Sequence, residues 1–312
     1  MQLFDHRISI SLLFLLALSQ FTLFNLCGAV PVLASRDDKQ LHPEADKRSE
    51  LDSSPQEAPP LGGRAASSRW WVPTQSTTWQ VQLSGTVDKR FNGNAIEFDA
   101  DTDTATVKYF KSKGIKTIAY ISAGSLEDWR IDVKSFPKVV IGRALAGWPG
   151  EYWLDIRQVN ILKKLMLDRL SKAKAKGFDG VDWDNVDGYT QDSGFKITYE
   201  QQLAYNKMLS EISHGLGMTV ALKNDLEQIR DLVGYFDFAV NEECGYYREC
   251  TMLAPFLNAG KAVVGLEYPG QGGDKRTYDQ VKARVDPRSY TLIKKLDLGA
   301  WGIVLRTLKS VI

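Results

Sequence analysis

The chain has 312 residues, of which 44% are hydrophobic and 25% are charged, a composition typical of a globular protein. Its formal net charge is only +1, so the overall charge gives no reason to expect nucleic acid or a strongly charged macromolecule as a partner. The length allows one large domain or two small ones, and we expect a monomer.

Residues 1–34 are expected to be an export segment that is separate from the fold. Arg7 precedes a long apolar run, and small residues suit cleavage after Ala29 or Ala34, as in a secretory signal peptide. The run is long for a signal peptide, so it could instead remain as a membrane anchor. In both cases we expect the rest of the chain to be extracellular, either secreted or anchored at the cell surface.

Residues 35–68 are predicted to be a disordered linker or pro-segment. They are rich in Pro, Ser, Gly and charged residues and contain no aromatic residue, so they cannot bury a core of their own. The folded domain is therefore expected at 69–312.

From Trp70 onward, short apolar runs alternate with segments of helical periodicity. Strands are predicted at 79–84, 95–100, 117–122, 180–184, 219–224, 236–242, 262–268 and 301–306. Helices are predicted near 102–113, 157–176, 199–216, 226–233, 249–259 and 276–296. Eight strands with helices between them predict a closed parallel (β/α)₈ barrel. An open doubly wound sheet is the alternative, but the glycine-rich phosphate turn that usually follows its first strand is absent here.

Acidic and amide side chains recur where the predicted strands end. The carboxyl ends of the strands build the active site of a barrel, so these groups are expected to meet there. Charged groups of one sign are rarely gathered without a function, because their mutual repulsion costs stability. The polar residues at the strand ends are Asp99, Asp101, Asp182, Asp184, Asn185, Lys223, Asn224, Glu242, Glu243, Glu267 and, for the last predicted strand, Arg306.

Several kinds of chemistry are excluded by the scarcity of histidine. Only His214 lies in the predicted domain, so a Ser-His-Asp triad or a histidine-rich zinc site cannot be built. An oxygen-only Mg²⁺ or Ca²⁺ site is possible in principle, but we expect neither a metal nor another cofactor. Carboxylate chemistry remains, and two carboxylates among aromatic side chains suit glycoside hydrolysis. Tyr120 is one of the aromatic residues on which a sugar ring could stack.

Two cysteines lie close together in the predicted domain. Cys244 and Cys250 are six residues apart, whereas Cys27 lies in the export segment. In an exported protein this spacing favours one short-loop disulfide, with a pair of free thiols as the alternative.

A series of motifs resembles glycoside hydrolase family 114, the endo-α-1,4-polygalactosaminidases. The similarity extends over about residues 70–270 and is less distinct in the last 40 residues. The motifs are, in chain order, W-x-P, TWQVQLSG, YISAGSLEDWR, GWPGEYWLDIR, GFDGVDWDNVDGYTQDSGF, QLAYN, LKND and YFDFAVNEEC. The resemblance implies a (β/α)₈ barrel, in agreement with the strand pattern, and an endo-acting hydrolase of α-1,4-linked galactosamine polymers.

The resemblance also implies the two catalytic carboxylates. They are the Asp of the motif D-N-V-D-G-Y and the first Glu of N-E-x-C, which are Asp184 and Glu242 here. Residue parity agrees with this, because Asp182 and Asp184 share one face of their strand, whereas Glu242 and Glu243 point to opposite faces. Which of the two carboxylates acts as the acid, and whether the anomeric configuration is retained or inverted, stays open at this point.

The remaining strand-end residues are expected to bind substrate or to adjust the catalytic pair. Asp99 or Asp101 could hold the ammonium group of galactosamine, and Lys223 and Asn224 could tune the pKa values of the pair. Substrate contacts are also expected from Tyr120, Asp182, Asn185 and Glu267. Two other functions remain possible: hydrolysis of a different α-linked glycan, and non-catalytic polysaccharide binding by a wall protein.

Overall fold

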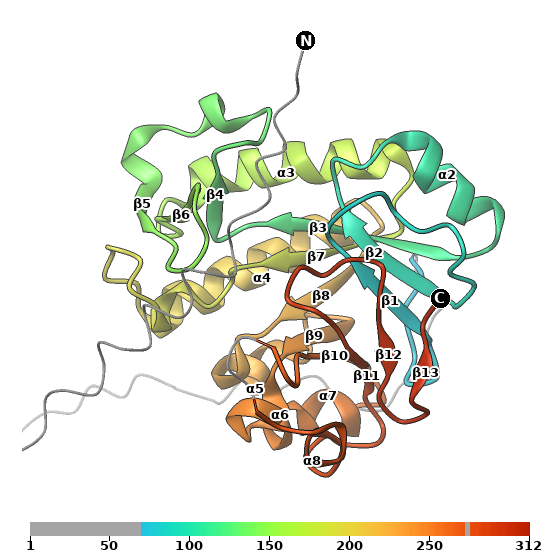
Figure 1. Cartoon of the computed structure of the whole chain (residues 1–312). Helices are drawn as coiled ribbons and strands as arrows, with labels where there is room; N and C mark the ends of the chain where they lie inside the picture. The colour runs from blue at the N-terminus through green and yellow to red at the C-terminus, as the bar shows by residue number, and fades with distance from the viewer. Residues whose placement is uncertain (1–69, 272–274) are drawn as a thin grey trace, which may run out of the picture. The chain divides into compact units, whose positions relative to one another are not determined.

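The structure, a computed structural model, describes residues 70–271 and 275–312 (Figure 1). The predicted export segment and the predicted linker therefore lie outside the described residues. Within the described ranges, no helix combines the length and the apolar character that crossing a membrane requires.

Eight parallel strands build the barrel, and each pairs with the next (Figure 1). This order confirms the predicted (β/α)₈ fold and brings all eight carboxyl ends to one rim. The strands are β1 (Trp79–Gln82), β2 (Ala95–Asp99), β3 (Lys116–Ser122), β7 (Gly180–Asp184), β8 (Thr219–Lys223), β9 (Phe238–Glu242), β10 (Ala262–Glu267) and β11 (Tyr290–Ile293). Two short antiparallel strands, β12 (Ile303–Val304) and β13 (Lys309–Ser310), follow β11.

The longest helices, α3 (Val159–Lys176) and α4 (Tyr199–Gly215), lie side by side against the outer face of the strands (Figure 1). A capping box of Thr198 and Gln201 begins α4, and Gly177 ends α3 at a φ of 109°, which glycine adopts without strain. The other α-helices are α2 (Thr104–Ser112), α5 (Ile229–Leu232), α6 (Cys244–Tyr247), α7 (Ala254–Asn258) and α8 (Tyr278–Lys282). Single 3₁₀ turns occupy Val133–Ser135, Lys138–Val140, Gly188–Thr190, Leu226–Gln228 and Cys250–Leu253.

A small antiparallel sheet is inserted between β3 and α3. It consists of β4 (Ser125–Glu127), β5 (Ile141–Ala144) and β6 (Glu151–Leu154), with β6 in the middle. The sequence pattern did not predict this sheet, because strands of three or four residues are too short to show an alternating period. The inserted sheet matters for the site, because it carries side chains toward the rim of the barrel.

The last part of the barrel differs from the prediction. The eighth parallel strand is β11, which lies inside the helix predicted at 276–296, and the predicted strand at 301–306 contains only the short antiparallel β12. The helical pattern there was misleading, since Pro287 cannot lie inside a helix without breaking it, and α8 ends five residues earlier. The residue that follows the eighth strand is therefore Lys294, and Arg306 does not lie at a barrel strand end.

Side chains and loop backbone bridge the seam between β11 and β1. Lys294 donates from Nζ to Oε1 of Gln80 at 3.1 Å and to the carbonyl oxygen of Gly299 at 2.7 Å. The side chain of Gln80 in turn donates to the carbonyl oxygen of Ala300, and Leu83 donates its backbone N–H to Leu298. These contacts join the first and the last barrel strands, so the rim that holds the site is closed.

Candidate active site

A pocket of ≈ 380 Å³ opens at the carboxyl ends of the barrel strands. Its walls come from β3, β7, β8 and β9 of the barrel and from the inserted sheet with its loops. The lining residues are Tyr120, Leu145, Ala146, Trp148, Glu151, Trp153, Asp184, Asn185, Val186, Asp187, Gln191, Lys223, Asn224, Glu242 and Tyr247. Acidic and aromatic side chains face the same space.

Lys223 lies between the two acids that the sequence motifs implied. Its Nζ is 3.0 Å from Oδ1 of Asp184 and 3.2 Å from Oε2 of Glu242. Burial opposes the charge of Lys223, but the two carboxylates outweigh burial and raise its pKa well above the ordinary value. The lysine is thus a cation that holds both carboxyl groups at the end of β8.

Each acid of the pair also accepts a hydrogen bond from a tyrosine. Tyr120 donates to Oδ2 of Asp184 at 2.7 Å, and Tyr268 donates to Oε1 of Glu242 in a short hydrogen bond. Burial alone would raise the pKa of Asp184, but the charge of Lys223 and the hydrogen bonds from Tyr120 and Lys223 bring it below its usual value. Asp184 is therefore an ionised carboxylate at neutral pH.

Asn224 fixes the backbone of the second acid. Its Oδ1 accepts the backbone N–H of Glu242 at 2.9 Å and a hydrogen bond from the side chain of Asn241 at 3.2 Å. Asn224 itself has a φ of 48°, a left-handed conformation that asparagine tolerates better than most residues. The strained turn after β8 thus supports the end of β9.

Asn185 and two serines form a group joined by hydrogen bonds, which supports the pocket wall at the ends of β3 and β7. The side-chain amide of Asn185 donates to Oγ of Ser122 at 3.0 Å and to Oγ of Ser125 at 3.1 Å. Gly124 lies against this turn so closely that a Cβ would be 1.6 Å from the carbonyl oxygen of Asn185. Glycine is required there, because only a bare backbone allows β3 and β7 to end so close together.

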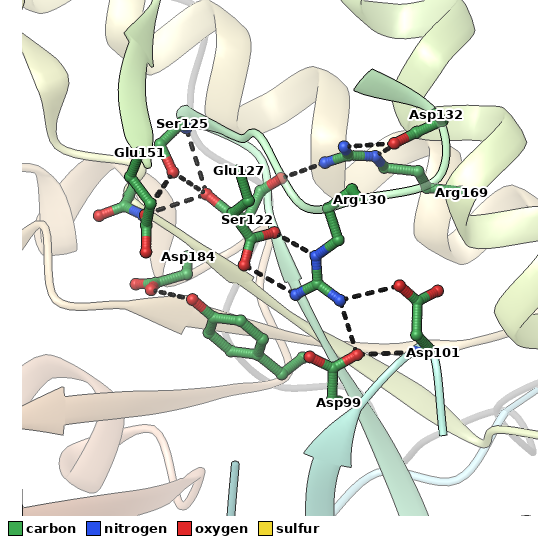
Figure 2. Close-up of polar contacts among 12 residues, drawn as sticks. Asp99, Asp101, Ser122, Ser125, Glu127, Arg130, Asp132, Glu151, Arg169 and Asp184 are labelled. Atoms are coloured by element: carbon green, nitrogen blue, oxygen red, sulfur yellow. Dashed lines mark hydrogen bonds and ion pairs between the residues drawn. The ribbon is translucent and has the colours of Figure 1, made fainter. Parts of the chain in front are cut away.

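Glu151 is a third acid in the pocket, and it comes from the inserted sheet. It lies at the start of β6, and its Oε2 accepts a hydrogen bond from Ser125 at 2.9 Å (Figure 2). Burial raises the pKa of Glu151 to about 7, although the hydrogen bond from Ser125 acts in the opposite direction. The site therefore contains a carboxyl group that changes its charge near neutral pH.

Asp99 and Asp101 do not reach the pocket, because Arg130 binds both. Arg130 lies in the centre of an acidic group in Figure 2 and contacts Asp99 at 2.7 Å and Asp101 at 3.0 Å. Two further hydrogen bonds of 2.6 and 2.7 Å join it to the carboxylate of Glu127. These acids attach the inserted sheet to the end of β2.

The residues singled out from the sequence fall into two groups. Tyr120, Asp184, Asn185, Lys223, Asn224 and Glu242 line the pocket. Asp99, Asp101, Asp182 and Glu267 lie outside its lining: the first two pair with Arg130, and the other two are buried. The pocket also contains residues that were not singled out, above all Glu151, from the motif GWPGEYWLDIR, and Tyr247.

Glu267 contacts the loop that follows Glu242. Its Oε1 accepts the backbone N–H of Gly245 at 2.6 Å, and Arg276 lies 3.3 Å from Oε2. The same loop contains the disulfide between Cys244 and Cys250, as the spacing of the cysteines predicted. Among the described residues, the sulfur atoms and Glu267 form the one group whose spacing would suit a metal ion. The two sulfur atoms are bonded to each other, however, and offer no free thiolate as a ligand.

Comparison with known proteins agrees with this geometry. The family model of glycoside-hydrolase family GH114 matches residues 62–309. The chain belongs to glycoside hydrolase family 114. It is thus an O-glycosyl hydrolase by family, with its acid pair at the rim of the family's barrel.

Solved structures show the same fold. A structure of Ega3 from Aspergillus fumigatus in complex with galactosamine shares 34% sequence identity and a TM-score of 0.70, covering 75% of this chain and 97% of that chain. The glycoside hydrolase domain of PelA from Pseudomonas aeruginosa shares 14% identity and a TM-score of 0.57, covering 74% and 99% of the respective chains. The second likeness concerns the fold alone. A search of curated proteins found no significant match.

Proposed function

We propose that this family 114 member is an endo-acting hydrolase of α-1,4-linked, galactosamine-containing polysaccharide, with Asp184 and Glu242 as its catalytic residues. The observation that carries the proposal is the contact of Lys223 with both acids inside one pocket. Two further facts support the substrate class: the similar Ega3 structure has galactosamine bound, and the pocket is rich in acid.

The spacing of the pair favours a double displacement, in which the anomeric configuration is retained. Lys223 contacts one oxygen of each acid, at 3.0 and 3.2 Å, so the two carboxyl groups share one cation, which suits the spacing of about 5–5.5 Å in retaining enzymes better than the about 6.5–9.5 Å of inverting enzymes. An inverting enzyme needs room for a water molecule between the sugar and its base. A retaining enzyme needs a carboxylate close to the anomeric carbon.

Asp184 is the better nucleophile, because its lowered pKa keeps it ionised. Its carboxylate attacks the anomeric carbon, while Glu242 gives its proton to the glycosidic oxygen as that bond breaks. Water then attacks the anomeric carbon of the covalent intermediate, Glu242 takes a proton from this water, and Asp184 leaves as a carboxylate. Lys223 and Tyr120 hold Asp184 in place by hydrogen bonds throughout.

Glu151 is the proposed partner of a substrate ammonium group. It replaces Asp99 and Asp101 in this role, because both of these bind Arg130. Glu151 lines the pocket and accepts a hydrogen bond from the neutral Ser125, and no salt bridge within the described residues involves its carboxylate. A free amine in this subsite would gain an ion pair in a partly buried place, whereas an acetylated amine would not.

We also infer that the enzyme works outside the cell. The apolar run within residues 1–34 suits an export signal, and a disulfide in the loop next to Glu242 suits an oxidising compartment. Residues 69–312 would then form the catalytic domain, with the preceding segment as its linker.

The test is digestion of α-1,4-linked galactosamine oligomers of mixed acetylation, with mass spectrometry of the products. We expect internal cleavage, with new ends beside deacetylated residues, and the first product formed should have the α configuration by NMR. The Glu242→Gln variant is the matched inactive control. Cleavage of a different α-linked glycan instead would replace the substrate class, and binding without any cleavage would favour a wall protein. A β product would exclude the double displacement.

A further inference from the structure

Two acids lie inside the barrel below the pocket, and the proposed reaction does not use them directly. Glu97 lies on β2 and Asp182 on β7, with exposed fractions of 1% and 0%. Both strands pair with β3, one on each side of it. Interior side chains of one layer of a barrel come from alternate strands, and this arrangement brings the two carboxyl groups together.

These carboxyl groups have few other partners. Within the described residues, both oxygens of Asp182 and Oε2 of Glu97 are buried and have no hydrogen-bond partner. Each of the two carboxyl groups acts on the pKa of the other, so a hydrogen bond between Glu97 and Asp182 is the one that could satisfy them. Two ionised carboxylates cannot form it, because neither has a hydrogen to donate. The contact is a hydrogen bond only when one of the two groups is protonated.

The surroundings determine which group keeps the proton. Burial raises the pKa of Glu97 well above its ordinary value, and the negative charges of Asp182 and Asp184 add to this effect. Burial also raises the pKa of Asp182, to about 7, but the cation of Lys223 on β8 opposes the shift most strongly. Asp184 on β7 and Glu242 on β9 are the other charged groups that act on Asp182. Lys223 thus stabilises the negative charge on Asp182, and Glu97 is left as the acid.

We propose that Glu97 and Asp182 share one proton at neutral pH, with Glu97 as the donor, and that their single negative charge sets the upper pH limit at which the catalytic pair above them is active. A negative charge near a carboxylic acid disfavours loss of its proton. Loss of the charge on Asp182 is therefore expected to move the alkaline limit of activity to lower pH. The shared proton follows from the structure alone, whereas the effect on the alkaline limit rests on the proposed function.

The shared proton can be tested without any activity measurement. Infrared spectra at neutral pH should contain the carbonyl stretch of a buried, protonated carboxylic acid that is lost in Glu97→Gln. The difference between the spectra of the wild type and the variant isolates this group from other acids with raised pKa values, such as Glu151. A difference spectrum without a lost acid band would overturn the proposal.

The effect on the catalytic pair is tested by the pH dependence of kcat/KM, whose alkaline limb reports the acid of the free enzyme. In Glu97→Gln the side-chain amide donates the same hydrogen bond, so Asp182 stays charged. The alkaline limb of the kcat/KM profile then keeps its wild-type position, even if the maximal value of kcat/KM changes. In Glu97→Leu the donor is lost, Asp182 takes up a proton, and the limb moves to lower pH. The expected shift is about one pH unit, the order of magnitude that removal of one nearby buried charge produces.

Asp182→Asn should shift the alkaline limb as Glu97→Leu does, because both remove the same charge, and this agreement would support the proposal. Circular dichroism and the melting temperature show whether each variant is folded. Because Glu97→Leu and Asp182→Asn are expected to give the same shift, the test stays decisive if one of them fails to fold. Identical limbs in Glu97→Gln, Glu97→Leu and Asp182→Asn would overturn the electrostatic role. If the wild type hydrolyses no galactosamine oligomer, the proposed function fails, while the infrared result still decides whether the proton is shared.

Discussion

At the scale of single residues, the site depends on one buried cation between two acids. Lys223 is only 5% exposed, so its charge depends on the acidic groups beside it in a place where water helps little. Tyr120 and Tyr268 then complete the hydrogen bonds of the two carboxylates. The pair is thus held in position before any substrate arrives.

Removing the charge of either acid should abolish most activity with little change in melting temperature. Asp184→Asn and Glu242→Gln keep the size of the side chain and an oxygen that accepts a hydrogen bond, but they lose the nucleophile or the proton. We expect kcat to fall by about 10²-fold or more. The control is Glu243→Gln, which changes the next residue in the chain and should retain most activity. A fully active Asp184→Asn enzyme would exclude the assignment.

Glu151 should make the use of deacetylated substrate depend on pH. Its pKa of about 7 means that the ionised fraction rises as the pH rises through neutrality. Binding of an ammonium group needs the ionised form, so KM for deacetylated oligomers should fall as pH rises from 6 to 8, until the sugar amine loses its own proton. Glu151→Gln should remove this dependence and leave acetylated oligomers little affected. Equal effects on both substrates would rule out the ion pair.

The sequence predicted the part of the site that follows from strand parity. Asp184, Lys223 and Glu242 end neighbouring strands of a parallel sheet, and side chains at such ends must meet at one rim. Glu151 was not predicted, because it lies on the inserted sheet and does not follow any strand of the barrel. The pairing of Asp99 with Arg130 also could not be foreseen, since it joins groups 31 residues apart whose distance depends on the inserted sheet.

At the scale of elements, the short helix α6 connects the end of β9, which carries Glu242, to the pocket wall. It begins directly after Glu243, whose backbone N–H is bound by the carbonyl oxygen of Leu266, and it carries Tyr247 to the pocket. The disulfide, the hydrogen bond from Gly245 to Glu267 and the one from Arg284 to the carbonyl oxygen of Gly245 all hold this helix. A single turn of helix would not be stable without such contacts.

Loss of the disulfide should therefore harm substrate binding more than stability. A loop this short contributes only about 2 kcal/mol by chain entropy. In a Cys244→Ser, Cys250→Ser double variant we expect KM to rise several-fold, because Tyr247 is no longer held at the wall, while the melting temperature falls by a few degrees. Glu267→Gln is the matched comparison, since it weakens a second contact of the same helix. Unchanged kinetics in both variants would show that α6 does not depend on these contacts.

Element prediction succeeded where a segment was long and periodic and failed where it was short. The helices α3 and α4 lie within two residues of their predicted bounds, because their apolar faces repeat over four or more turns. The four residues of β11 are too few to outweigh the helical spacing of Val281 and Val285 before them. In such a case the proline between the two segments is the better guide.

At the scale of the whole molecule, Lys294 should make stability depend on pH. It is 1% exposed, and burial lowers its pKa to about 7, whereas an unfolded chain keeps a lysine pKa of about 10.4. Between these values the unfolded state binds a proton that the folded state does not, so the free energy of unfolding should rise with pH from about 7 to about 10. As a neutral amine, Lys294 still has two N–H groups for its two acceptors.

The measurement is the melting temperature as a function of pH for the wild type and for Lys294→Met. We expect the variant to lose the rise between pH 7 and 10, and to keep kcat/KM, since Lys294 does not line the pocket. Gln80→Leu serves as a comparison, because it removes one acceptor at the seam and should cost about 1–3 kcal/mol. A wild-type curve that is flat over this range would mean that Lys294 stays charged when folded.

The contacts between β1 and the residues after β11 also determine when the active site can assemble during synthesis of the chain. Gln80 meets Lys294 and Ala300 across 214 and 220 positions of the chain, so these contacts cannot form before Lys294 and Ala300 have left the ribosome. Contacts between such distant positions form slowly, because most of the chain must first be ordered. Glu97, Asp182 and Lys223 would meanwhile remain hydrated and separately charged. The site is thus assembled only once the last barrel strand has reached the first.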